Sequence, residues 1–262
     1  MTLFLISCSL SGYCVRKFLR YNNHHHWIGE TNNKHHIVDD RKARFTRTRP
    51  KRTKKIPKDW DTYSFEDVYR HFHCWSHARD NTKPIPSLEQ WLFLRKQYNE
   101  YVDGSVFFND PIPPTQGYTL SDDKPPPFYP KLSPGKGRGL FASRDIKKGE
   151  IVHDGTNSDV VFPDAKSFRR FLFALPRTMS CDMMEWTWTQ QLHEDGPYHI
   201  CLSINIASLM NTESDEEEAN ALPKTSTSTV FYATRDIRKG EEILTDYSVY
   251  ETDWVAVGMD NL

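Results

Sequence analysis

One segment of the chain combines glycines with basic residues in a way that would let the backbone touch another molecule. It reads GKGRGLFASRDIKKGEIV from Gly135 to Val152, with a glycine at every second position as far as Gly139. Because glycine has no Cβ, this backbone can bend sharply and approach a partner group closely. The pattern A-x-R-D-I-x-K-G-E occurs at 142–150 and again at 233–241. Taken alone, the two copies predict a pair of strand–turn–strand hairpins.

Histidine and cysteine are the next residue types that could do chemistry. His73 and His77 are four residues apart, so on a helix they would share one face, as metal ligands do. No second ligand pair stands nearby, so packed or solvated histidines are the favoured interpretation and no metal is expected. The five cysteines, at 8, 14, 74, 181 and 201, form neither a zinc pattern nor a disulfide framework. This spacing favours a reducing intracellular compartment.

Charge is distributed unevenly along the chain. Residues 1–58 contain 14 Lys/Arg and 3 Asp/Glu, whereas the remainder contains 20 and 32. The run at 41–58 has ten basic residues and no acidic one, which predicts a disordered arm. Such an arm could also direct nuclear import or contact nucleic-acid phosphates. The apolar run at 3–15 is too short for a transmembrane helix, but residues 1–20 leave targeting to an organelle or to endomembranes open.

The elements that must position these residues follow from apolar spacing and capping residues. Residues 64–104 predict two helices, the first including His71, His73, Cys74 and His77, and the second beginning at Ser87. Eight prolines at 111–134 indicate a linker or a wrapped extended segment. Short strands and turns follow.

Three further elements are expected between the chemically interesting segments. KSFRRFLFAL at 166–175 predicts an amphipathic helix, and 183–188 and 199–204 predict strands. On a strand, Trp186 and Trp188 would share a face, where stacked core packing is favoured over an aromatic cage for methylated lysine.

Three segments taken together resemble the SET domain of protein lysine methyltransferases. They are GKGRGLFA, the run SINIASLMN that ends at Asn211, and RDIRKGEEILTDY, which contains Tyr247. They occur in the order of the family and cover about residues 131–250. The resemblance implies a mainly β fold of several small sheets with short helices, in which a knot-like C-terminal segment builds the active site. It also implies S-adenosylmethionine as the methyl donor and a protein lysine as the acceptor.

The resemblance assigns roles by motif position. The implied cofactor-binding residues are Lys136, Gly137, Arg138, Asn211, Thr212 and Tyr247, the first three acting largely through backbone atoms. Tyr247 is also the implied catalytic residue, beside the methyl group in transfer. Phe231 and Tyr232 would line the substrate channel, although ordinary strand packing explains them equally well.

These residue types suit the chemistry of methyl transfer. Displacement at a sulfonium methyl needs alignment of the two reactants above all. The lysine must react as a neutral amine, whereas free lysine has a pKa of about 10.4. An apolar, aromatic channel disfavours the ammonium form and lowers that pKa. A tyrosine hydroxyl can then steer the amine.

Two departures from the family pattern leave alternatives open. The family places a histidine after the asparagine, where this chain has Thr212 and then the acidic run at 213–218. That run is either a solvated loop or a surface that attracts a basic peptide such as a histone tail. No cysteine cluster follows Tyr247 in this sequence, so the zinc lobe of many relatives is not expected here. A non-catalytic SET-fold module and an organelle- or membrane-associated methyltransferase therefore remain the alternatives to a nuclear enzyme that acts on histones.

The expected organisation of the chain has five parts. They are a disordered basic arm at 1–58, a helical region at 59–110, a proline-rich linker at 111–130, the SET domain at 131–250 and a C-terminal tail at 251–262.

Overall fold

A computed structural model describes residues 56–102, 126–156, 159–213, 218–250 and 253–260. The apolar run at 3–15, the basic run as far as residue 55, the prolines at 111–125 and the acidic residues at 214–217 lie outside the described residues. The chain divides into two units, 1–55 and 56–262. All of the described helices and strands belong to the second unit.

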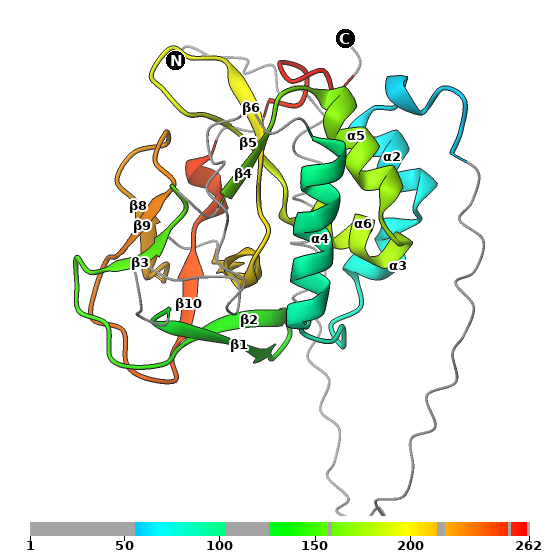
Figure 1. Ribbon diagram of the computed structural model, residues 1–262. Coiled ribbons are helices and arrows are strands. Elements are labelled where there is room, and N and C mark those ends of the chain that lie inside the picture. The colour runs from blue at the N-terminus through cyan, green and yellow to red at the C-terminus, as the bar shows by residue number, and fades with distance from the viewer. Residues whose placement is uncertain (1–55, 103–125, 157–158, 214–217, 251–252, 261–262) are drawn as a thin grey trace, which may run out of the picture. The chain divides into compact units, whose positions relative to one another are not determined.

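Three small sheets form the β part of the fold (Figure 1). The first has the strand order β1 (Phe128–Ser133), β2 (Gly137–Ala142), β10 (Glu242–Thr245), β7 (Asn211–Thr212). The second is β3 (Ile151–Asp154), β9 (Val230–Ala233), β8 (Ala221–Pro223), and the third is β4 (Asp159–Phe162), β6 (Tyr198–Ser203), β5 (Trp188–Gln191). The predicted class, mainly β in several small sheets with a helical region before them, is confirmed. The strand expected at 199–204 is β6.

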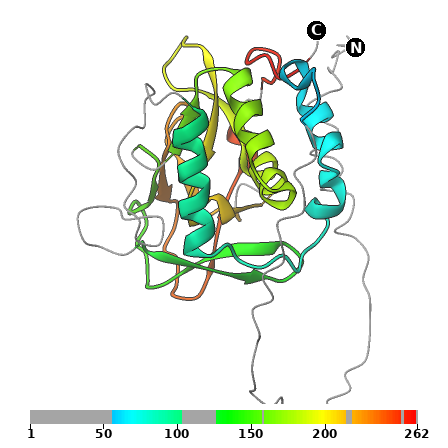
Figure 2. The same ribbon diagram turned by 45° about the vertical axis from the view of Figure 1, so that its right-hand side comes forward.

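The helices gather on one side of the sheets (Figures 1 and 2). They are α2 (Phe65–His71), α3 (Cys74–Ala78), α4 (Leu88–Tyr101), α5 (Ala165–Ala174) and α6 (Arg177–Trp186), and the 3-10 turn η1 (Trp60–Thr62) precedes α2. Two further 3-10 turns, η2 (Ile206–Leu209) and η3 (Tyr247–Val249), lie among the strands. Capping boxes at Ser64 and Ser87 start α2 and α4, because each serine and the residue three positions later satisfy each other's backbone N–H. Both predicted helix starts and the amphipathic helix α5 are therefore confirmed.

The helices and the sheets share one apolar core. Trp91 and Leu94 of α4 belong to the same buried cluster as Leu140 of β2 and Phe168 of α5. The capping box at Ser87 fixes where α4 begins. Burial of Trp91 and Leu94 then fixes which face of α4 packs against the core. Among the described helices, none is both long and apolar enough to cross a bilayer.

The single helix expected around His73 is in fact two. α2 ends at His71, and His73 adopts a left-handed conformation with φ 55° before α3 begins. The break is stabilised from another element, because Arg177 donates hydrogen bonds to the carbonyl oxygens of Phe72 (2.5 Å) and His73 (2.8 Å). His73 therefore lies before the helix that carries His77, and the shared helix face expected for the two residues does not form.

The strand expected at 183–188 is also wrong. Helix α6 continues to Trp186, and β5 begins only at Trp188. A short apolar run fits either period, and here the burial of Met183 and Met184 on a helix decides. Trp186 packs against Trp91 with ring centroids 5.5 Å apart, whereas Trp188 lies near Tyr250 at 6.3 Å. The two tryptophans form no common face.

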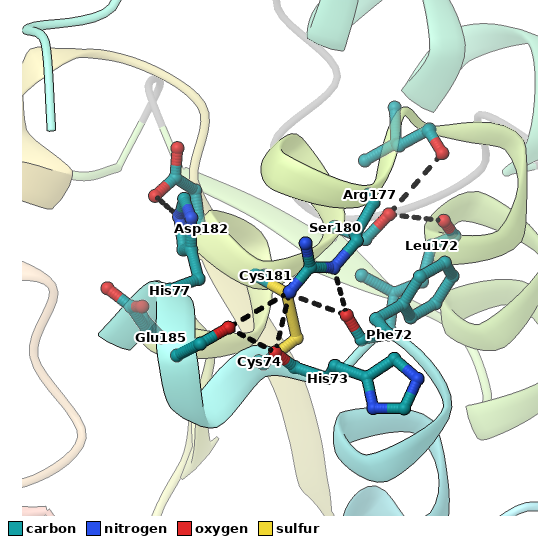
Figure 3. The surroundings of a disulfide bond; sticks show 12 residues. Phe72, His73, Cys74, His77, Leu172, Arg177, Ser180, Cys181, Asp182 and Glu185 are labelled. Carbon is teal, nitrogen blue, oxygen red and sulfur yellow. Dashed lines mark hydrogen bonds and ion pairs between the residues drawn. A yellow bond between two sulfur atoms is a disulfide. The ribbon is translucent and has the colours of Figure 1, made fainter. Parts of the chain in front are cut away.

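The expectation of no disulfide was wrong as well. Cys74 of α3 and Cys181 of α6 are bonded across a sequence separation of 107 residues (Figure 3). Spacing could not reveal this pair, because only the packing of α3 on α6 brings the two sulfurs together. Because disulfides are rare in reducing compartments, the cysteines no longer support the prediction that the protein is located in one. Cys201 is buried and not disulfide-bonded.

The repeated nine-residue pattern forms two matching loops. Ile146 and Ile237 pair across them, each N–H donating to the other's carbonyl oxygen at 2.9 Å. In each copy the arginine forms an ion pair with the last glutamate at 2.5 Å, Arg144 with Glu150 and Arg235 with Glu241. The repeat thus ties the beginning of the SET-like region to its end.

Two boundaries fall at places that the residue pattern did not indicate. Strand β1 begins at Phe128, inside the stretch 111–130 that the prolines assign to a linker. Pro130 fits there because β1 is an edge strand and needs no N–H on its outer side. In the stretch assigned to a C-terminal tail, Trp254 packs on Phe65 with ring centroids 4.3 Å apart. The Phe65 N–H donates to the Met259 carbonyl oxygen.

Candidate active site

The site is built where β10 lies between β2 and β7. β10 runs antiparallel to β2 and parallel to β7, with Leu244 opposite Asn211 and Thr245 opposite Thr212. The chain then returns to β10 at Asn220, whose N–H donates to the Leu244 carbonyl oxygen at 2.9 Å. This places the Asn211 segment and the C-terminal segment side by side, as the resemblance to SET domains implies.

Asn211 is held by its side-chain amide. Its Nδ2 donates to the Arg138 carbonyl oxygen at 3.0 Å and to Glu242 Oε1 at 2.8 Å. Thr212, which stands where the family has histidine, accepts the Tyr247 N–H on its Oγ1 at 3.1 Å. The structure therefore brings four of the predicted cofactor residues together through direct hydrogen bonds: Arg138, Asn211, Thr212 and Tyr247.

Tyr247 begins η3, directly after the N-cap Asp246. The residue is 42% exposed as a whole, and its hydroxyl, at the more buried end of the side chain, donates a hydrogen bond to the Met210 carbonyl oxygen. Burial raises the pKa of this phenol to about 12. The phenol is therefore protonated at neutral pH, with its single proton directed to Met210, and a phenolic oxygen that donates can also accept a hydrogen bond.

Lys136 lies in the turn between β1 and β2, and Gly137 is the first residue of β2. Gly137 has a φ of 82°, a left-handed conformation that glycine adopts at little cost. The Lys136 N–H donates to Ser133 at 3.2 Å, and its ammonium pairs with Glu213 at 2.6 Å. This ion pair joins the turn to the segment after Asn211.

The Arg138 side chain is used inside the protein. It is buried, it pairs with both carboxylate oxygens of Asp182 at 2.6 and 3.2 Å, and its guanidinium lies 4.9 Å from the centre of a Trp186 ring. Only its backbone is placed toward Asn211. This arrangement is compatible with the prediction that Arg138 serves the cofactor through backbone atoms, a role that remains a proposal.

Asp182 and Glu185 form an ion-pair network one turn apart on α6. His77 Nε2 lies 2.7 Å from Asp182 Oδ1, and Lys83 Nζ lies 2.8 Å from Glu185. The ligand atoms of His77, Asp182 and Glu185 lie within 4.8 Å of one another, which is close enough for a metal. The cations of Lys83 and Arg138 already balance both carboxylates, so we interpret the cluster as structural.

The two carboxylates of this network respond to burial in opposite ways. Burial by itself disfavours the Asp182 carboxylate, but its hydrogen bonds with His77 and Arg138 outweigh that effect and hold its pKa below the ordinary 3.8. For Glu185, burial outweighs the attraction of Lys83 and raises the pKa above the ordinary 4.5. Asp182 is therefore the member whose charge stabilises the fold at neutral pH.

Replacing Asp182 with Asn should lower the free energy of unfolding by about 3 kcal/mol near pH 7, because Arg138 then stays buried without its carboxylate. A depressed carboxyl pKa gives stability that is present above the unfolded value and lost as the pH falls through the folded value. Urea unfolding of both proteins, compared near pH 7 and at a pH below the ordinary carboxyl pKa of 3.8, should thus show a gap in the free energy of unfolding that narrows in acid. Asp236→Asn is the control, because its carboxylate is 61% exposed and should have a much smaller effect. An equal gap at both pH values would contradict the assignment.

The two predicted channel residues do not share a side of their strand. Successive residues of a strand point to opposite faces. The Phe231 ring lies 6.3 Å from Tyr250, whereas the Tyr232 ring lies under Lys224 at 4.1 Å. Phe231 therefore faces the C-terminal segment that carries Tyr247, and Tyr232 belongs to another environment.

The sequence pattern did not indicate a position near Tyr247 for Tyr250, and for Trp188 it favoured core packing over an aromatic cage. Trp188, Tyr250 and Phe231 form a chain of rings at successive centroid distances of 6.3 Å. Tyr250 is buried, which raises the pKa of its phenol, and the charge of Asp159 adds to that effect. One signal was available, because Tyr250 follows Tyr247 by one 3-10 turn. The position of Trp188 depends on the third sheet and had no local signal.

Comparison with known families agrees with the motifs. Residues 137–248 match the model of the SET domain. The chain therefore contains a SET domain, and the resemblance seen in the sequence is confirmed. No curated protein matches the sequence.

Solved structures with similar backbones include two named for histone methylation or for a Polycomb complex. One is a Plasmodium falciparum protein named as a candidate histone methyltransferase, with 22% identity and a TM-score of 0.31, over 47% of this chain and 95% of that one. Another is the Chaetomium thermophilum Polycomb Repressive Complex 2 bound to S-adenosylmethionine, with 22% identity and a TM-score of 0.33. That match covers 48% of this chain and 15% of the other.

Proposed function

We propose that this protein is an S-adenosylmethionine-dependent protein-lysine N-methyltransferase whose substrates include histones. One observation carries the proposal. Asn211 on β7 and Tyr247, which follows β10, lie side by side within the region matched to the SET domain. The residues around Asn211 are the proposed site of the methyl donor, and those around Tyr247 are the proposed site of the lysine.

The residues around Asn211 suit the methyl donor. Both N–H groups of the Asn211 amide are used, so the amide offers its oxygen, an acceptor that suits an ammonium group. Gly139 leaves space beside it, because a Cβ there would lie 2.5 Å from Glu242 Oε1 and 3.0 Å from Asn211 Nδ2. When bound, S-adenosylmethionine would supply the methyl group and the positive sulfonium from which it leaves.

The residues around Tyr247 suit the lysine. The Tyr247 hydroxyl donates its hydrogen bond to the Met210 carbonyl oxygen and so would meet the amine as a hydrogen-bond acceptor, which orients the nitrogen lone pair. The rings of Phe231, Tyr250 and Trp188 supply apolar surroundings that disfavour the ammonium form. Tyr232, which faces Lys224, has no part in this proposal.

Charge supports a basic substrate and a nuclear location. The chain after residue 58 has 20 Lys/Arg against 32 Asp/Glu, a balance that attracts basic proteins. The basic run at 41–58 would serve nuclear import and could add a weak contact with nucleic acid. A fluorescent reporter fused to residues 1–60 that collected in an organelle would contradict the nuclear location.

The test is transfer of labelled methyl from S-adenosylmethionine to mixed core histones. Label should enter histone bands and should be absent from histones whose lysines have been acetylated beforehand, because acetylation removes the nucleophilic amine. Calorimetry should show S-adenosylmethionine binding to the same preparation. Neither binding nor transfer would overturn the proposal in favour of a non-catalytic SET-fold module. Binding, with label only in other proteins of a cell extract, would overturn the histone part alone.

A further inference from the structure

One carboxylate on β10 links strand β1 to the segment that ends at Asn211. Glu242, the first residue of β10, accepts from Asn211 Nδ2 on Oε1 at 2.8 Å and from Ser133 Oγ on Oε2 at 2.8 Å. Ser133 is the buried last residue of β1, opposite Gly137 in the β1–β2 register. The carboxylate also lies against Gly139, where a Cβ would come within 2.5 Å of Oε1.

This arrangement fixes which way the Asn211 amide faces. The amide nitrogen has two N–H groups, and its two partners, the Arg138 carbonyl oxygen and the Glu242 carboxylate, both accept hydrogen bonds. A flipped amide would direct its oxygen at two acceptors and lose both bonds. Among the described residues, nothing donates to Asn211 Oδ1, so this oxygen is the group that the side chain can offer a ligand.

The Ser133 hydroxyl supports the carboxylate in turn. A free glutamate side chain rotates about several bonds, and fixing it costs conformational entropy. The hydrogen bond from Ser133 holds the second carboxylate oxygen, which leaves Oε1 directed at Asn211. Because Ser133 is itself in a paired strand, the amide of Asn211 is positioned from the rigid β1–β2 hairpin.

We propose that Glu242, supported by Ser133, is a positioning residue that orients Asn211 so that its amide oxygen binds the ammonium group of the methyl donor's amino-acid portion. This inference rests on the proposed function. It assigns Glu242 and Ser133 a selective effect on one part of the ligand, because the oriented oxygen can bind a cation but adds nothing for a ligand that lacks the ammonium group.

The experiment compares two ligands by calorimetry on the full chain. S-adenosylhomocysteine carries the amino-acid portion, and methylthioadenosine lacks it. Glu242→Ala should weaken binding of S-adenosylhomocysteine about 10-fold, the effect expected for loss of one oriented hydrogen bond to a charged group. Its affinity for methylthioadenosine should change by less than about twofold, since that ligand has no ammonium.

Three further variants separate positioning from general support of the fold. Glu242→Gln should restore most of the affinity, because its amide oxygen can accept from Asn211 while its nitrogen faces Ser133. In Asn211→Ala, adding Glu242→Ala should have no further effect on S-adenosylhomocysteine, because residues that act as a unit are not additive. Should Glu242→Ala fail to fold, Ser133→Ala should show the same selectivity between the two ligands, with a smaller loss of affinity for S-adenosylhomocysteine.

The outcomes separate this proposal from the proposed function. Equal weakening of both ligands, or no weakening of either, would overturn the positioning role while leaving the methyltransferase proposal intact. A wild-type chain that binds neither ligand would overturn both. Selective loss for the ligand with the ammonium group, with recovery in Glu242→Gln, supports the assignment.

Discussion

Replacing Tyr247 with Phe should reduce the rate of methyl transfer by about 10²–10³-fold, the size expected when one positioned hydroxyl is lost from an active site. The ring stays, so its packing is kept, and only the oxygen that would orient the lysine amine is removed. Binding of S-adenosylmethionine should change by less than about threefold, because the Tyr247 hydroxyl would contact the lysine that accepts the methyl group and not the methyl donor. The measurement is kcat for labelled transfer beside the calorimetric dissociation constant of the donor.

Tyr232→Phe is the matched control for this change. It removes the same hydroxyl from a tyrosine on β9 whose ring contacts Lys224 and lies outside the Phe231–Tyr250 environment. Transfer by this variant should stay within about twofold of the wild type. Equal losses in the two variants, or full activity in Tyr247→Phe, would show that the Tyr247 hydroxyl has no special role. Because burial raises the Tyr247 pKa to about 12, ionisation of this group should not limit activity below about pH 10.

Opening the disulfide should have the largest effect on stability. Cys74 and Cys181 are 107 residues apart, and closing a loop of about 100 residues accounts for about 4.7 kcal/mol in the chain-entropy model. Measured disulfides commonly contribute less, so reduction should lower the free energy of unfolding by about 2–5 kcal/mol. Urea unfolding with and without a thiol reductant measures this. The doubly substituted Cys74→Ser, Cys181→Ser protein should be as unstable as the reduced wild type and insensitive to reductant.

Cys201 provides the control, because it is buried but not disulfide-bonded. Cys201→Ala should lose some stability from the smaller side chain, yet reductant should destabilise it as much as it destabilises the wild type. If reductant changed neither protein, the disulfide would contribute nothing to stability in solution. If it affected wild type but not Cys201→Ala, Cys201 would be the redox-sensitive group instead.

The disulfide and the α6 ion pairs together couple the helical region to the SET domain. On α6, Cys181 is bonded to Cys74 of α3, and the next residue is Asp182. The Asp182 carboxylate contacts His77, also on α3, and forms an ion pair with Arg138 in β2. The Arg138 carbonyl oxygen in turn receives the Asn211 amide. The helical region therefore stabilises the strand on which the proposed cofactor site is built.

Much of the fold could be predicted from short stretches of sequence because the relevant physics is local. A serine with its partner three residues later caps α2 and α4, and the nine-residue repeat with its glycine forms a similar loop at each of its two positions. The three motifs in family order predicted the SET domain, and their hydrogen-bonded residues Arg138, Asn211, Thr212 and Tyr247 do meet.

Features that depend on distant partners could be decided only by the tertiary structure. The helix breaks at His73 because Arg177, over 100 residues later, binds the carbonyl oxygens there. The segment at 183–188 fits a strand or a helix by its pattern, and burial of its methionines against the core selects the helix. The Cys74–Cys181 bond, the pairing of Arg138 with Asp182 and the orientation of Asn211 by Glu242 have the same origin. Each joins residues that chain spacing leaves unrelated, and only packing brings their atoms within bonding distance.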